Sequence, residues 1–321
     1  MCIRAVHFGS CLILQSVFVL LLLAVVPGWK EPGGSGAAAG DHFQRLLHRL
    51  TVICLLAAAV SGFLWLWFAI ASMSDSGLFD ALRQSLFWMV LTQTPPGFVW
   101  LLRAGIALIF AIALFFAFGT KDRWSVARWP IPLCALSAIA LTASLAWLGH
   151  AGAGEDANQN LHLGADLLHL LSAGIWPAGL APFAIFLSCF LKLKDPSLLS
   201  AACVATRRFS AFSLFTVAVL FASGIANSYF LVGTFHAVVS TEYGLLLVLK
   251  IVLACVAVGF GAWNLFAFTP RLAVAEGTLP DETQSAALGK VVRNVWVEFC
   301  LSSLVLLVVG LLGITAPATH P

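Results

Sequence analysis

The sequence predicts an all-α, polytopic integral membrane protein with about eight transmembrane helices in two four-helix parallel repeats. Hydrophobic residues make up 61% of the 321 positions and charged residues only 10%, and the mean hydropathy is +0.99. Soluble domains carry about 25% charged residues. Apolar stretches of near-spanning length and short motifs that recur in both halves complete the prediction.

Eight stretches have the length and apolar character of a membrane-spanning helix, which needs about 20 residues. In order, they are 7–27, 49–71, 97–118, 129–149, 162–190, 209–232, 244–268 and 294–314. The first follows Arg4 and resembles the apolar part of a signal peptide. No small-x-small cleavage pattern precedes Pro27, so we expect a retained helix.

The distribution of basic residues predicts the orientation. The loops after the first, third, fifth and seventh stretches hold 13 of the 17 Lys and Arg residues. Basic loops remain in the cytoplasm. Both termini are therefore predicted to face outward.

Two connecting segments carry their own predictions. Residues 77–96 space apolar side chains as an amphipathic helix does, which favours a helix at the membrane interface over a span. Gly33 to Gly40 is rich in Gly, Ala and Ser and is predicted to be an unstructured cytoplasmic linker.

An internal repeat is visible in short matches. The pattern Thr94-x-x-Gly97 with Arg103 corresponds to Thr241-x-x-Gly244 with Lys250 at an offset of 147. Ser61-Gly62 corresponds to Ser223-Gly224, and His7 to His169, at an offset of 162. We therefore predict an N-terminal half at 1–148 and a C-terminal half at 149–321, running in the same direction.

The strongest chemical signal is a break between apolar helices that carries several histidines. His150 ends one stretch, and His162, Asp166 and His169 follow at helical spacing, which places the last three on one face. His236 lies in the next outer loop, and Glu242 begins the seventh helix. Imidazole and carboxylate groups suit copper(II), zinc or nickel, and a carboxylate can orient a histidine ligand. The alternative is a set of interfacial polar residues satisfied by water and loop carbonyls.

Three further charges lie inside predicted spans. Arg103 and Lys250 would be cations that steer an ion path or neutralise carboxylates, or else snorkel to the interface. Glu298 is a candidate stepping stone for a proton or an ion, unless it reaches the interface. Trp176, Pro177 and Gly179 interrupt the fifth stretch, and helix packing is the favoured interpretation over an ion path.

Several classes of function are not expected. The net charge of +3 is too small and dispersed to indicate nucleic acid as a partner. Eight cysteines form no C-x-x-C pair, and three methionines exclude a methionine-rich copper(I) box. No G-x-x-x-x-G-K-[ST] loop occurs, so no ATPase within this chain drives transport.

The chain resembles the copper resistance protein D family along essentially its whole length, most strongly from His150 to Asn264. The runs that carry the resemblance are Gly149-His150-Ala151, Asp166-x-x-His169-Leu170-Leu171, Trp176 with Gly179-Leu180, Arg208-Phe209-Ser210, Ser223-Gly224-x-x-Asn227, Thr241-x-Tyr243-Gly244 with Lys250, and Val297-Glu298. One departure is Trp176-Pro177-Ala178-Gly179-Leu180, where the family usually has Trp-Leu-Gly-Gly-Leu.

The resemblance implies a multi-pass protein of the bacterial inner membrane, in which the distribution of basic residues predicts that both termini lie in the periplasm. It implies copper transport from periplasm to cytoplasm, in copper homeostasis and resistance, beside a periplasmic copper-binding protein of the copper resistance C type. The implied copper ligands are His150 and His169, with Asp166 in support, and His162 and His236 would deliver the ion. We do not expect an enzyme.

Two other functions stay open. Paired histidines on membrane helices also hold b-type haem, so His150 with His169, or His7 with His169, could be axial ligands of an oxidoreductase. The chain could also bind copper at the periplasmic face without transporting it.

Overall fold

The computed structural model describes residues 2–25, 35–73, 79–80, 84–118, 130–149, 152, 158–192, 196–273 and 281–318. Every regular element within these ranges is a helix. Eight of the described helical segments are long and apolar enough to cross a membrane. The predicted all-α, polytopic fold class is therefore confirmed.

The first four spans come from the N-terminal part of the chain. They are formed by α1 (Cys2–Leu20) with the π-helix η1 (Leu21–Val25), α2 (Ser35–Met73), α4 (Pro95–Phe118), and α5 (Pro130–Ala143) with the 3-10 helix η4 (Ser144–Leu148). The short helix α3 (Gln84–Gln93) precedes α4. This helix confirms the helical prediction for that part of residues 77–96, and it packs Leu91 against Leu66 and Ile70 of α2.

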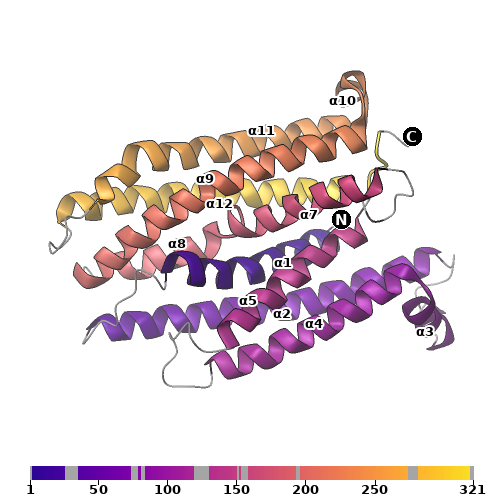
Figure 1. Ribbon diagram of the computed structural model, residues 1–321, viewed down its shortest axis with the longest axis horizontal. Helices are drawn as coiled ribbons and strands as arrows, with labels where there is room; N and C mark the ends of the chain where they lie inside the picture. Colours follow the sequence, from indigo (N-terminus) through magenta and orange to yellow (C-terminus); the bar gives the residue numbers. More distant parts are fainter. Residues whose placement is uncertain are drawn as a thin grey trace.

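The remaining four spans follow in the same order as predicted. They are α7 (Gln159–Ile175) with α8 (Leu180–Leu191), α9 (Pro196–Val232), α11 (Glu242–Trp263) with the π-helix η5 (Asn264–Phe268) and the 3-10 helix η6 (Thr269–Leu272), and α12 (Glu282–Leu312). The short helix α10 (Phe235–Ser240) precedes α11. Figure 1 shows α3, α10 and the C-terminus at one end of the molecule.

The start of α2 corrects one prediction. This helix begins at Ser35, so the expectation of an unstructured linker is wrong for residues 35–40, while 33 and 34 lie outside the described residues. Three consecutive alanines, Ala37–Ala39, have the highest helix propensity of any residue. Their propensity, together with continuation into an apolar helix, outweighs the neighbouring glycines.

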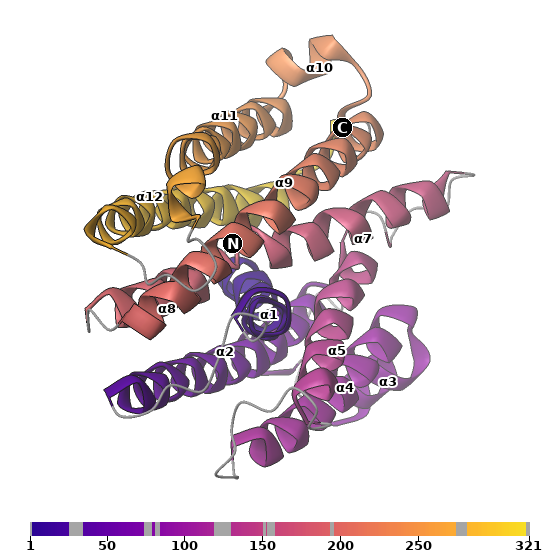
Figure 2. The same ribbon diagram turned by 60° about the vertical axis from the view of Figure 1, so that its left-hand side comes forward.

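The first helix lies at the centre of the molecule. Figure 2 shows α1 almost end-on, surrounded by other helices, and it packs against α2, α5, α7, α8 and α12. Small residues make this packing close, since a Cβ at Gly9 would lie 2.7 Å from Leu306 Cδ2 of α12. A helix in this position contacts spans from both the N-terminal and the C-terminal part of the chain.

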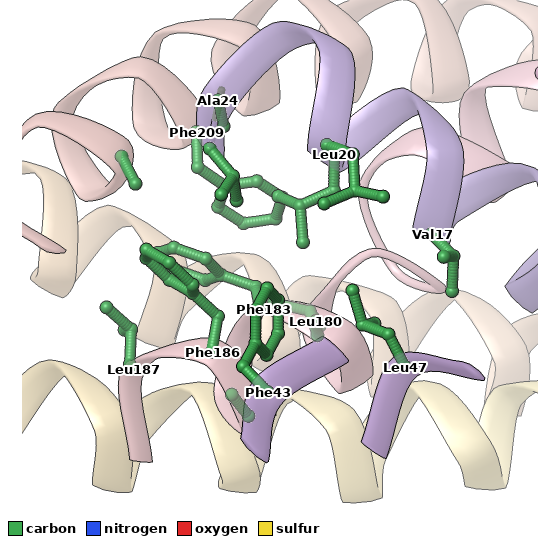
Figure 3. Close-up of a cluster of buried hydrophobic side chains, with 14 of the residues drawn as sticks. Val17, Leu20, Ala24, Phe43, Leu47, Leu180, Phe183, Phe186, Leu187 and Phe209 are labelled. Carbon is green, nitrogen blue, oxygen red and sulfur yellow. The ribbon is translucent and has the colours of Figure 1, made fainter. Parts of the chain in front are cut away.

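The main apolar core lies where α1, η1, α2, α8 and α9 meet (Figure 3). Phe43 of α2 and Phe186 of α8 meet edge to face with ring centroids 5.2 Å apart. Phe183 of α8 stacks on Phe209 of α9 with centroids 4.3 Å apart. Aromatic pairs in these geometries add to the contact energy of area burial, so this core ties together spans from the N-terminal and C-terminal parts of the chain.

The break between α7 and α8 serves packing, as the sequence favoured. Trp176 is only 4% exposed. A Cβ at Gly179 would lie 3.2 Å from the ring of Phe209 and would also collide with the carbonyl of Ile175. Glycine at this position therefore allows α9 to approach the break closely.

Candidate functional site

The C-terminal cluster consists of Asp166, His169, Ser223, Asn227 and Lys250. Nδ1 of His169 on α7 lies 3.1 Å from the carbonyl oxygen of Leu220 and 3.2 Å from Ser223 Oγ, both on α9. Nε2 of the same ring lies 3.4 Å from Lys250 Nζ on α11. One turn away, Asn227 Nδ2 donates to Asp166 Oδ1 at 3.3 Å. Three helices thus converge on one imidazole, one carboxylate and one ammonium.

The N-terminal cluster consists of His7, Ser61, Trp65, Trp100 and Arg103. Nδ1 of His7 on α1 lies 3.0 Å from the carbonyl oxygen of Ala58 and 3.2 Å from Ser61 Oγ, both on α2. Nε2 lies 2.6 Å from Arg103 Nη2 on α4. The rings of Trp65 and Trp100 pack around the imidazole, with centroids 5.7 and 5.5 Å away. His7 and Arg103 are each only 3% exposed.

The partners assign the same tautomer to both histidines. Arg and Lys side chains can only donate hydrogen bonds, and a backbone carbonyl can only accept. Nδ1 of each ring therefore carries the proton and donates to the carbonyl, while Nε2 accepts from the cation. In both clusters the nitrogen that could bind a metal faces a positive charge.

The two clusters share their geometry at the positions that the sequence matched. Each histidine contacts residues 51 and 54 positions further along the chain. Gly62 and Gly224 both lie against the imidazole, where an added Cβ would be 2.9 and 3.3 Å from Cε1 of its ring. Thr94 and Thr241 each donate to a carbonyl four residues back and accept from the glycine three residues ahead. The division of the whole chain into two parallel halves stays a prediction.

The cation is the main difference between the clusters. The Nη atoms of Arg103 make four contacts, to His7, the Leu141 carbonyl, Ser144 Oγ and Cys11 Sγ. Lys250 contacts His169 at the longer distance of 3.4 Å and attracts Asp166 without forming a salt bridge. The position three residues before the histidine is Asp166 in one cluster and Arg4 in the other. Only the C-terminal cluster therefore contains a carboxylate.

The other predicted outer residues have separate surroundings. His162 stacks on Phe230 with ring centroids 4.9 Å apart, on the same helix as Asp166 and His169. His236 is exposed on α10, and its Nδ1 lies 3.2 Å from Ser240 Oγ. Glu242 is exposed in the first turn of α11. His150 lies outside the described residues, and the described part contains no group of three His, Cys, Asp or Glu residues that could hold a metal.

Glu298 is buried in the middle of α12, with 2% of its surface exposed. Asn264 Nδ2 donates to Glu298 Oε1 at 2.8 Å, and Asn294 Nδ2 donates to Asn264 Oδ1 at 2.9 Å. The sequence singled out Glu298 but did not predict the two asparagines. It also missed the contact of Asn227 with Asp166, although Asn227 belongs to the Ser-Gly-x-x-Asn run that could have indicated it.

Comparisons with known proteins identify relatives of the chain. The family described as Copper resistance protein D matches residues 204–312, and the Copper resistance protein D-like, N-terminal domain matches residues 1–160. Copper resistance protein D of Pseudomonas syringae pv. tomato is 30% identical over 83% of this chain and 82% of its own. Inner membrane protein YebZ of Escherichia coli (strain K12) is 26% identical over 98% of this chain and 97% of its own. Copper transport protein CutJ of Bacillus subtilis (strain 168) is 30% identical over 53% of this chain and 29% of its own.

Among solved structures, none matches the chain. Eight apolar helices and a similar inner-membrane protein define a multi-pass protein of the inner membrane, with imidazole and charged groups buried between its helices. The chain belongs to the copper resistance protein D family. This relationship supports a copper-related function in the membrane, and the names of the relatives describe copper resistance and transport rather than enzymes.

Proposed function

We propose that this protein carries copper across the inner membrane from the periplasm to the cytoplasm and captures the ion at the C-terminal cluster. The observation that carries the proposal is the convergence of His169, Asp166 and Lys250 from α7 and α11. His150, which the sequence singled out as a ligand, would complete the ligand set with His169. His162 and His236 would pass the ion to this site from the outer surface.

Lys250 allows the site to exchange an ammonium group for a copper ion. The lone pair of His169 Nε2 faces the ammonium group, so a copper ion and Lys250 compete for the same atom. When copper binds, the ammonium must move away, and the nearby Asp166 carboxylate can hold it or the ion. The Asn227 amide fixes one oxygen of that carboxylate at 3.3 Å. Capture of the ion is thus coupled to a movement of one flexible side chain.

The N-terminal cluster supports a different role. It has the same imidazole geometry, but the guanidinium of Arg103 is held by four contacts and no carboxylate belongs to the cluster. A cation that replaced Arg103 would leave several buried acceptors unsatisfied, which is costly. We therefore place copper capture at His169 and assign His7 a structural role.

Copper influx into proteoliposomes that hold the full chain tests the proposal. A metal-sensitive dye inside the vesicles reports entry of Cu(I) or Cu(II) supplied outside, since the methionine-poor sequence leaves the oxidation state open. Influx is expected for the wild-type protein and is expected to be lost in the His150→Ala/His169→Ala variant. His7→Ala, which removes the corresponding imidazole of the other cluster, serves as the matched control and should retain influx if it folds.

Two outcomes separate the rival functions. Copper bound at the outer face without influx would identify a periplasmic-face binding protein instead of a transporter. A copper-binding protein of the copper resistance C type would then be the natural donor to add. A Soret absorbance band in protein purified from haem-sufficient cells would support the b-type haem alternative. The His7–His169 pairing has less support, because Nε2 of His7 faces Arg103, which three further contacts hold in place.

A further inference from the structure

A third polar centre of the bundle lies around Glu298, away from the C-terminal cluster. Along α11, Lys250 of the C-terminal cluster and Gly261 beside Glu298 are separated by eleven residues, or about 16 Å at 1.5 Å per residue. A Cβ at Gly261 would lie 3.1 Å from Glu298 Oε2, so the glycine makes room for the carboxyl group. Glu298 and the C-terminal cluster therefore lie at different levels along α11.

A hydrogen-bonded ladder leads from Glu298 across three helices. Asn264 donates to Glu298 and begins the π-helix η5. The hydroxyl of Thr269 donates to the Asn264 carbonyl at 3.0 Å and lies 3.3 Å from Ser210 Oγ on α9. π-Helical turns inside α-helices frequently occur at functional sites. Here the π-helical turn directs the Asn264 amide at the Glu298 carboxyl group and the Asn264 carbonyl at the Thr269 hydroxyl group.

No described cation neutralises Glu298. From α11 and η5 it is faced by Gly261 and Asn264, and no described titratable group of α1, α8 or α9 contacts its carboxyl group. Three charged groups at this end are engaged elsewhere. Lys290 and Arg271 lie over the Phe268 ring, at 5.6 and 6.0 Å from its centroid, and Arg208 donates to the carbonyl of Leu23. A carboxylate in an apolar setting without a cation is costly.

We propose that Glu298 is a proton-carrying carboxyl group. It holds a proton in the resting state, and the Asn264 amide stabilises the ionised form after the proton leaves for water. Proton release leaves a negative charge inside the bundle, which attracts a cation that enters from the outer site. The exchange of a proton for copper rests on the proposed function, whereas the proton-carrying role of Glu298 does not.

Labelling with dicyclohexylcarbodiimide tests the proton site without copper. This lipophilic reagent adds to a protonated carboxyl group in apolar surroundings: the acid proton goes to a carbodiimide nitrogen and the carboxyl oxygen to its carbon, and rearrangement gives a stable N-acylurea. We expect the full chain in lipid vesicles to be labelled at Glu298 at acidic pH and progressively less at alkaline pH, as measured by peptide mass spectrometry. Glu242 and Glu282 are exposed in first helical turns and serve as internal controls.

Two variants make the result decisive. Glu298→Asp keeps an acid and should still be labelled, whereas Glu298→Gln keeps an acceptor for Asn264 and should not be. Absence of label on wild-type Glu298 at every pH, or labelling that does not change with pH, would overturn the proton-carrying role.

The coupling to copper has its own measurement. In vesicles with an imposed pH gradient, the gradient-driven part of copper influx should be lost in Glu298→Gln and retained in Glu298→Asp. Equal gradient dependence in Glu298→Gln and wild type would overturn the coupling. If the wild-type protein moved no copper while Glu298 was still labelled as expected, the proposed transport function would fail and the proton site would stand.

Discussion

At the scale of single residues, the type of cation that faces Nε2 of the imidazole differs between the two clusters. This difference distinguishes a site that is closed to a metal ion from one where a metal ion can displace the cation. Arg103 presents a planar fork that contacts two oxygens, one sulfur and one ring nitrogen. Lys250 presents one ammonium group on a flexible chain. Arg and Lys are not interchangeable where several acceptors share one cation. Lys250 can therefore move away from its imidazole more easily than Arg103 can.

We expect substitution of each of these two cationic residues by the other type to affect different properties. Arg103→Lys should destabilise the protein by about 2 kcal/mol, because buried acceptors lose donors, with little effect on copper influx. Lys250→Arg should fold normally but slow copper influx, since a guanidinium would hold His169 Nε2 more firmly. Thermal unfolding in detergent and vesicle influx measure the two effects. Equal influx in Lys250→Arg and wild type would argue against displacement of the cation by copper.

The two glycines beside the histidine rings provide a second comparison. At Gly62 an added methyl group would lie 2.9 Å from His7 and 3.0 Å from Trp100, whereas at Gly224 it would lie 3.3 Å from His169. Gly62→Ala should therefore destabilise the protein by about 1–3 kcal/mol through overpacking, and Gly224→Ala by less. The midpoints of thermal unfolding of the two variants give the order, and a larger loss for Gly224→Ala would contradict it.

At the scale of elements, polar contacts position the interrupted helix α7–α8 against the central helix α1. Gln15 Nε2 of α1 donates to the Leu171 carbonyl of α7 at 2.9 Å. The same side chain fills the space beside Gly174, where a Cβ would lie 2.5 Å from its amide. Helices in membranes approach closely where small residues and interhelical hydrogen bonds combine. This contact fixes the part of α7 that follows His169.

A double-mutant cycle tests this contact between elements. Gly174→Ala should destabilise the protein by about 1–3 kcal/mol, because the Gln15 amide would have to shift and give up its hydrogen bond to the Leu171 carbonyl. Gln15→Ala removes the obstacle, so the double variant should be more stable than the sum of the two single effects predicts. Unfolding temperatures of the four proteins give the interaction energy, and strict additivity would show that the two positions act independently.

At the scale of the whole molecule, the arrangement of the spans determines which polar groups reach which side of the membrane. The C-terminal cluster lies near the end that carries α10, and the basic residues Arg271 and Lys290 lie at the other end of the α11–α12 pair (Figure 1). Basic loops remain in the cytoplasm. We therefore expect α10 to face the periplasm.

Labelling of introduced cysteines in whole cells tests this orientation. After replacement of the eight natural cysteines, His236→Cys should react with a membrane-impermeant maleimide added outside the cells. Lys290→Cys should react only after the membrane is permeabilised. Reversal of the two patterns would show that the chain has the opposite orientation.

The sequence by itself determined the fold class, the order of the eight spans and the pairing of matched motifs such as Ser61-Gly62 with Ser223-Gly224. These properties follow from the length of the apolar stretches and from the spacing of short motifs, and both can be read directly from the sequence. Only the tertiary structure decided that α1 lies at the centre, that Arg103 and Lys250 face His7 and His169, and that Asn264 and Asn294 accompany Glu298. Those contacts join residues 30 to 96 positions apart. Spacing along one helix cannot place such partners, because the packing of several helices around a buried polar group selects them.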